Sequence, residues 1–159
     1  MRKRLGRLAA AALSLALSAC GAGVEGITMP PPIDMAHLER PGSPNTALAA
    51  PDGFTPKPDI LTPVYDRPAD DLYAAVIEVA RRQEQTYLLK RYDDRRQVHF
   101  VARVSVFGFP DLITVQVTED GAARSRLVIW SHSVYGYSDF GVNRKRVAQW
   151  LVALGDNNS

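Results

Sequence analysis

The residues that decide the fold read VHFVARVSV (98–106), ITVQVT (113–118) and RSRLVIWSHS (124–133). Apolar and polar side chains alternate in the first two segments, which predicts strands with one buried face and one wetter face. Asp120 and Gly121 stand between the last two segments and are typical of a hairpin turn. The segment 86–92 is rich in aromatic and branched residues and indicates a further strand before them. The sequence thus predicts four consecutive strands joined by short connections.

Amphipathic helices are predicted on both sides of these strands. Leu72, Val76 and Val79 recur at helical spacing within residues 68–85. A last helix has an apolar stripe of Val147, Trp150, Leu151 and Leu154. Short connections favour antiparallel pairing, because parallel neighbours need a long crossover. The predicted fold class is therefore α+β, a two-layer domain in which a four-stranded antiparallel sheet carries two helices on one face, in the order α-β-β-β-β-α.

A proline-rich segment precedes this core. Nine of the eleven prolines lie between residues 20 and 63. Proline lacks an amide donor and fixes one backbone torsion, so we expect neither a long helix nor a central strand there. We interpret residues 20–40 as a tether. Residues 41–159 are predicted to be a single domain, with an extended arm over 41–63 and a core over 64–154.

The first residues have the three-part layout of an export signal. Basic residues are followed by an apolar run over 8–17 and then by small residues. The run is about half of the ~20 residues that a membrane-spanning helix needs. The tetrad Leu17-Ser18-Ala19-Cys20 resembles a bacterial lipobox, whose cysteine receives a diacylglyceryl group before cleavage. We therefore expect a lipoprotein signal peptide over residues 1–19 and lipidation of Cys20.

Lipidation of Cys20 would anchor the chain in the cell envelope, facing the periplasm, because two acyl chains give stable attachment. Gly21 is not the aspartate associated with inner-membrane retention in enteric bacteria, which favours the outer membrane. Cys20 is also the only cysteine, so no intramolecular disulfide can form. Once the four basic residues of the signal are removed, 15 basic side chains remain against 17 acidic ones. This balance gives no electrostatic basis for nucleic-acid binding.

The segment 135–146 carries the candidate site. Arg144, Lys145 and Arg146 fall near the start of the predicted last helix, where the helix dipole disfavours positive charge. One interpretation is a site in which these cations and free amides bind a phosphate or carboxylate. In the other, Ser138 or Asp139 caps the helix and an arginine pairs with an aspartate. The candidate binding or structural residues are Tyr137, Ser138, Asp139, Asn143, Arg144, Arg146, Asp111 and Asn45.

A family resemblance rests on the run from Tyr135 to Arg146, the triplet Phe109-Pro110-Asp111 and the triplet Ser43-Pro44-Asn45. Together they resemble the bacterial family known as domain of unknown function 1499, over nearly all of residues 41–154. The resemblance implies a small envelope or exported protein with no established activity, and it places the arm inside the domain. His132 departs from the family pattern, in which arginine commonly stands between the two serines.

Catalytic and metal-binding patterns are weak. The three histidines are His37, His99 and His132. Their spacing predicts no metal site, and we expect no cofactor. A relay of Ser138 and His132 with Asp139 or Asp111 lacks a nucleophile elbow. The sequence favours a non-enzymatic binding or structural module at the membrane surface, with an envelope protein or an anionic ligand as its partner. The alternative is a hydrolase or transferase acting on an envelope lipid or peptidoglycan component.

Overall fold

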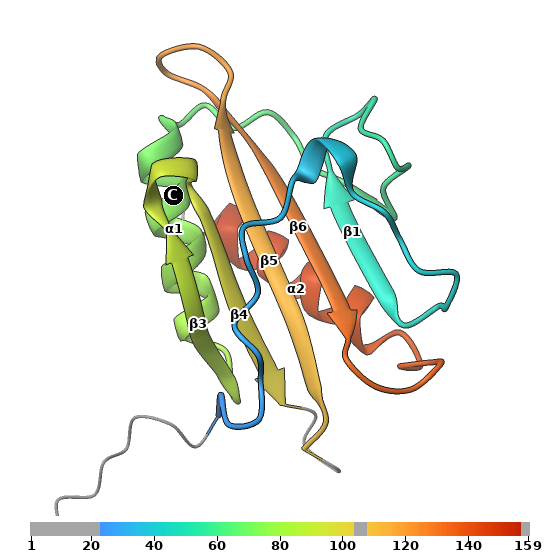
Figure 1. Cartoon of the computed structure of the whole chain (residues 1–159). Helices are drawn as coiled ribbons and strands as arrows, with labels where there is room; N and C mark the ends of the chain where they lie inside the picture. The colour runs from blue at the N-terminus through green and yellow to red at the C-terminus, as the bar shows by residue number, and fades with distance from the viewer. Residues whose placement is uncertain (1–22, 104–107, 157–159) are drawn as a thin grey trace, which may run out of the picture.

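The computed structural model describes residues 23–103 and 108–156 (Figure 1). The predicted signal peptide, Cys20 and part of the predicted strand over 98–106 lie outside the described residues. The elements, in chain order, are η1 (Met35–His37), β1 (Thr46–Ala50), β2 (Ile60–Leu61), α1 (Ala69–Arg81), β3 (Thr86–Tyr92), η2 (Asp93–Arg95), β4 (Gln97–Arg103), β5 (Pro110–Glu119), β6 (Ser125–Ser133) and α2 (Val142–Asp156).

The described strands form one six-stranded sheet in the order β2-β1-β6-β5-β4-β3. β3 to β6 pair antiparallel with their neighbours, as the short connections predict. β1 also pairs antiparallel with β6, whereas β1 and β2 are parallel. The α+β class is confirmed, but the sheet has six strands and not four, because the arm over 41–63 adds β1 and β2.

The sequence of β1 explains why it was missed. It reads TALAA between two prolines, and alanine is depleted in strands. All four residues from Ala47 to Ala50 are nevertheless fully buried. Ala47 and Ala49 pack in the core under the helices, while Leu48 and Ala50 pack on the opposite face. The strand is therefore specified by tertiary burial on both faces and not by its own propensity.

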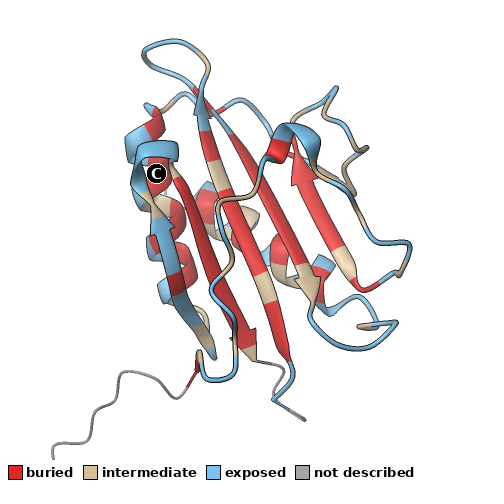
Figure 2. Cartoon of the chain, in the orientation of Figure 1, coloured by how far each residue is buried: buried red, intermediate tan, exposed pale blue. Residues whose placement is uncertain are grey.

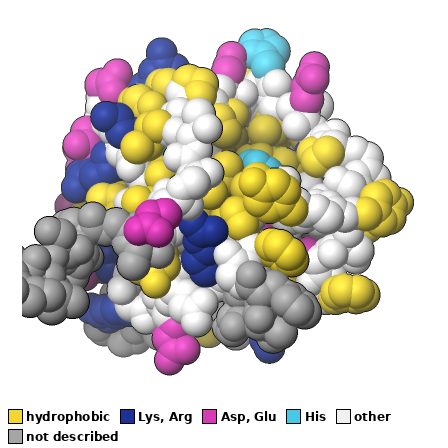
Figure 3. Space-filling view, turned by 60° about the horizontal axis from the view of Figure 1, so that its bottom comes forward, with side chains coloured by type: hydrophobic (Ala, Val, Ile, Leu, Met, Phe, Trp, Pro, Cys, Tyr) yellow, Lys and Arg dark blue, Asp and Glu magenta, His cyan; other side chains and the backbone are white. Residues whose placement is uncertain are grey.

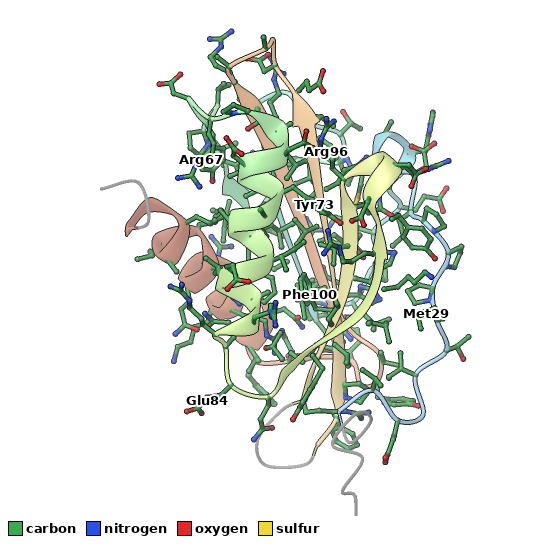
Figure 4. The ribbon with its side chains drawn as sticks, turned by 90° about the vertical axis from the view of Figure 1, so that its left-hand side faces the viewer. Met29, Arg67, Tyr73, Glu84, Arg96 and Phe100 are labelled. Carbon is green, nitrogen blue, oxygen red and sulfur yellow. The ribbon has the colours of Figure 1, made fainter. Side chains whose placement is uncertain are left out.

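α1 and α2 cover one face of the sheet (Figures 1 and 4). The predicted stripe of α1 and most of that of α2 are buried there. The rings of Phe100 on β4 and Trp150 on α2 meet edge to face, 5.6 Å apart. α1 ends at Arg81 and not at the predicted Gln85, since Gln85 has a φ of 51° and its carbonyl accepts a hydrogen bond from the Arg103 amide.

The segment 27–40 crosses the other face of the sheet (Figures 1 and 4). Ile33 and Gln97 exchange two hydrogen bonds, of 2.7 and 2.8 Å, between backbone and side chain. Met35 is buried in a second apolar cluster with Leu48, Ala50, Val128 and Trp130. This arrangement differs from the tether expected over residues 20–40. The reason is that apolar side chains within this segment cover sheet residues that would otherwise face water (Figure 2).

We call the bottom of Figure 1 the lower end of the domain. The described chain begins there, and the loops 108–109 and 134–141 lie there too. Arg103, the last described residue of β4, holds the beginning of the chain in place. Its guanidinium donates hydrogen bonds to the carbonyls of Gly23 (3.0 Å), Glu25 (2.6 Å) and Gly108 (3.1 Å). The described part of the chain therefore begins at the lower end.

Candidate functional site

A buried ion pair joins α2 to the sheet. β5 holds Asp111, whose side chain is 1% exposed, and α2 holds Arg146, whose side chain is 13% exposed. Nη2 of Arg146 donates to Oδ2 of Asp111 at 2.7 Å. A charge-assisted hydrogen bond of this kind is stronger than a neutral one, but its two charges are stable in a dry site only while they remain paired. This contact agrees with the interpretation in which an arginine pairs with Asp111.

Asn143 connects the ion pair to two strands. Its side chain is fully buried, and its amide nitrogen donates to the Asn45 carbonyl (3.2 Å) and to Oγ of Ser133 (3.0 Å). Its amide oxygen accepts from Ser131 Oγ and from Nη1 of Arg146 (2.8 Å). The amide group thus uses two donor hydrogens and two acceptor positions. α2, β6 and the residue preceding β1 are held together through this single side chain.

Asp139 caps the start of α2. Its carboxylate accepts hydrogen bonds from the backbone amides of Gly141 (3.0 Å) and Asn143 (2.7 Å). A negative charge at this position also compensates the positive charges that follow it, and it interacts favourably with the positive end of the helix dipole. Ser138, the other predicted cap, instead accepts a longer hydrogen bond from the Phe140 amide, at 3.3 Å. Asp139 is therefore the residue that closes the helix end.

Asn45 attaches the arm to the loop before α2. Its side-chain nitrogen donates to the Gly136 carbonyl at 2.6 Å, and its side-chain oxygen accepts from Ser43 Oγ at 2.7 Å. Its backbone carbonyl also accepts from the Ser133 amide. We use the name polar lock for the connected set Asn45, Asp111, Ser131, Ser133, Asp139, Asn143 and Arg146. The lock brings together five of the eight residues predicted for the site, and adds Ser131 and Ser133.

The three neighbouring cations do not converge on one anion site. Arg146 points into the lock, as described above. Arg144 is exposed and donates to the Asp59 carbonyl at 3.3 Å, at the arm. Lys145 is exposed on α2. The structure therefore separates side chains that the sequence placed next to one another, because successive residues on a helix face different directions.

The residues considered for a catalytic relay are engaged elsewhere. Ser138 is exposed, and the Asp139 carboxylate is occupied by amides of the helix start. His132 lies in β6 with its ring stacked on Trp130, at 5.4 Å between centroids. Burial lowers the pKa of His132, and the nearby charge of Asp111 opposes this effect. The imidazole is therefore neutral near pH 7 and is packed as part of the sheet.

Within the described ranges, the structure contains neither a metal-binding cluster nor a membrane-spanning helix. Across residues 23–103 and 108–156, no group of three or more histidine, cysteine, aspartate or glutamate side chains is placed to hold a metal ion. Across the same ranges, no helix combines the length and apolar character needed to cross a bilayer. His99 donates to or accepts from Thr114 Oγ1 at 2.8 Å, and burial lowers its pKa, opposed by the backbone at Pro31.

Exposed aromatic side chains lie in the loops at the lower end. They are Phe109 (53% exposed), Tyr135 (61%), Tyr137 (74%) and Phe140 (97%), and we call them the aromatic rim. The rings of Phe109 and Tyr135 lie 6.3 Å apart. Figure 3, which brings the lower end forward, shows hydrophobic side chains gathered on this face. Of this set, the sequence predicted only Tyr137 as a site residue. The several aromatic residues in this glycine- and serine-containing loop were the signal that could have identified the others.

The fold and the lock define a single α+β domain in which a C-terminal helix is fastened to the sheet by a buried polar network. Residues 38–154 match the model of the family described as "Protein of unknown function (DUF1499)", and the chain belongs to this family. The comparison with curated proteins gives no match.

Among solved structures, the chain is similar to the crystal structure of the di-domain ARO/CYC BexL from the BE-7585A biosynthetic pathway. The identity is 17% and the TM-score is 0.48, over 70% of this chain and 45% of that one. The chain thus spans less than half of that di-domain protein, and a similarity of this level assigns no activity.

Proposed function

We propose that this chain is an envelope lipoprotein whose domain acts as a non-enzymatic binding or structural module at a membrane surface. The observation that carries the proposal is the lipobox-like tetrad ending at Cys20, which follows a basic start and an apolar run. A diacylglyceryl group on Cys20 would supply the two chains that stable anchoring needs. The preference for the outer membrane, from Gly21, is part of the same proposal.

The position of the described chain start supports an anchor close to the domain. Only two residues separate Cys20 from Gly23, and Arg103 binds the carbonyls of Gly23 and Glu25. The three residue steps from Cys20 to Gly23 span at most about 11 Å. Residues 27–40 lie on the sheet and so provide no spacer. A lipid on Cys20 would therefore hold the domain directly at the membrane, with the lower end facing it.

The lock supports a role in binding or structure over catalysis. Catalysis by side chains needs groups that are free to meet a substrate and to exchange protons with it. In the lock, the carboxylates of Asp111 and Asp139 and the amide of Asn143 are bound to the protein's own donors and acceptors. These hydrogen bonds account for them as groups that stabilise the position of α2. The exposed side chains at the lower end include an aromatic surface, which suits contact with a partner.

Mass spectrometry of the protein isolated from its native envelope tests the anchor. We expect a chain that begins at Cys20 and carries acyl groups, and that sediments with membranes. A Cys20→Ala variant should lack the acyl mass and retain the leader, because the cysteine is modified before cleavage. Its unfolding transition should be unchanged, because residue 20 lies outside residues 38–154 that match the family model. An intact leader, or an unmodified thiol on protein that remains in the soluble fraction, would refute the proposal.

A further inference from the structure

The aromatic rim is an unusual surface for a water-exposed loop. Tyr137 is 74% exposed and Phe140 is 97% exposed, and both belong to the loop that leads into α2. Phe140 also has a φ of 53°, a conformation that side chains beyond glycine and asparagine rarely adopt. Phe140 thus combines an exposed apolar ring with a backbone conformation that is unfavourable for a residue with a side chain. Solubility and local stability would both favour a different residue at this position.

Positive charge lies beside the rim. A hollow of about 700 Å³ opens between the end of α1, the start of α2 and the lower ends of β3 and β4. Its charged lining residues are Arg82, Arg103, Lys145 and Arg146, against the single carboxylate of Glu84. Arg103 and Arg146 are bound to protein groups, whereas Arg82 and Lys145 are exposed. The net charge of the hollow is therefore positive, although Glu25 lies at the same end.

These two surfaces lie at the same end of the domain as Gly23, the first described residue. The guanidinium of Arg103 lines the hollow and also binds the carbonyls of Gly23 and Gly108. Phe109 of the rim follows Gly108 directly. The chain start, the rim and the hollow are thus connected through neighbouring residues. Aromatic side chains concentrate at the headgroup level of membranes, and Lys and Arg near the surface are attracted to anionic lipids.

We propose that the lower end of the domain lies on the lipid surface, with the aromatic rim in the headgroup layer and the hollow facing anionic phospholipid headgroups. This inference rests on the proposed lipid anchor at Cys20. An anchor three residues before Gly23 would keep the rim at high local concentration next to the bilayer, so that individually weak contacts suffice to orient the domain. The occupant of this surface is then the membrane itself, and not a soluble protein.

Fluorescence quenching by brominated phospholipids tests the orientation. The acylated chain is placed in vesicles of phosphatidylethanolamine and phosphatidylglycerol, with bromines on the acyl chains of a fraction of the lipid. Phe140→Trp introduces the probe at the rim, whereas the native Trp130 and Trp150 are buried. Leu61→Trp is the matched control, because Leu61 is 62% exposed and pairs with Ala50 at the far end of β1. Wild-type protein in the same vesicles gives the background.

We expect the emission of the tryptophan at position 140 to fall about twofold in brominated vesicles, and that of the tryptophan at position 61 to match the wild-type background. The quenching at position 140 should decrease when phosphatidylglycerol is omitted, or when Lys145→Glu is added. Quenching that is absent at both positions, or equal at both, on protein that sediments with the vesicles would overturn the proposed orientation and leave the anchor intact. Protein that carries no acyl group would instead overturn the proposed function.

Discussion

The polar lock and the aromatic rim both include residues of the segment 135–146, but the protein uses these residues differently. Asp139, Asn143 and Arg146 point inward, and their polar atoms are bound to the protein. Tyr135, Tyr137 and Phe140, in the preceding loop, point into solvent. The segment 135–146 therefore contains residues with two different roles. Its charged and amide residues secure the fold, while its aromatic residues form the surface that is available to a partner.

Asp111→Asn should have the largest effect on stability. The change keeps the shape but removes the charge that compensates Arg146, which is 13% exposed. Breaking a buried pair by removing one partner costs about 3–5 kcal/mol. Urea unfolding followed by circular dichroism measures the loss. Arg144→Ala is the matched control on the exposed side of α2, and it should change the unfolding free energy by less than about 0.5 kcal/mol. Equal effects of the two changes would contradict the division.

Asn143→Ala should come next. It removes the amide that bonds Ser133, the Asn45 carbonyl and Arg146, and it leaves these buried groups without that partner. Unsatisfied buried groups cost about 1–3 kcal/mol, so we expect a loss near 2–3 kcal/mol by urea unfolding. A loss below about 0.5 kcal/mol would show that water replaces the amide and that the lock is open.

Asp139→Ala should cost about 0.5–2 kcal/mol, because the first amides of α2 lose their acceptor. Ser138→Ala is the control, since Ser138 accepts only a 3.3 Å hydrogen bond in an exposed turn. Thermal unfolding of both variants would compare the two predicted caps. A larger effect at Ser138 than at Asp139 would mean that the serine is the effective cap.

Stability should also fall as the pH is lowered, through the buried histidines. Burial lowers the pKa of His99 and of His132, which lies between two serines of the lock. Above the unfolded-state pKa of about 6.5 the imidazoles are neutral in both states and contribute no pH dependence. Below it the unfolded chain binds protons first, so the unfolding free energy decreases as pH falls.

His132→Gln should reduce this decrease between pH 7 and pH 5.5, as measured by urea unfolding at each pH. The comparison with wild type separates the histidine from carboxylates, which titrate mainly at lower pH. A slope in the variant that is equal to or steeper than that of wild type would contradict the assignment of a neutral, buried imidazole at this edge of the lock.

Tyr137→Ser should have the smallest effect. Tyr137 is 74% exposed, and a surface substitution away from special features usually changes the unfolding free energy by less than about 0.5 kcal/mol. The same variant should retain the unfolding cooperativity of wild type. A loss comparable with that of Asn143→Ala would place the rim within the packed structure and would remove the distinction between the two regions.

Periodicity in the sequence predicts much of the fold and little of what holds it together. Alternation of apolar and polar residues predicts β4 and β5, and helical spacing predicts both helices. Residue composition predicts β3, and the hairpin signal before it supports β6. β1 and the contact between Ile33 and Gln97 do not follow from such patterns, since alanine gives no strand signal and the hydrogen bonds join residues 64 positions apart. Local patterns report local structure, whereas these features depend on which surfaces the rest of the chain leaves uncovered.

The candidate site shows the same limit. The cap at Asp139 depends on neighbouring residues, and the pairing of an arginine with Asp111 depends on opposite charges. The sequence therefore predicts both as one of two interpretations. The role of Asn143 requires knowledge of Asn45, which lies 98 positions away in sequence. The sequence does not predict the exposure of Phe140 either, because apolar residues are buried or exposed according to the position of neighbouring loops.

A double-mutant cycle on Asp111 and Arg146 tests the central claim most directly. The unfolding free energies of Asp111→Asn, Arg146→Gln and the double variant are measured under the same conditions. Because the two side chains meet at 2.7 Å and are shielded from water, the account predicts a coupling energy of about 2 kcal/mol, within the range found for interacting neighbours. Effects that add to within about 0.5 kcal/mol would show that the pair does not hold α2 to the sheet and would contradict the account.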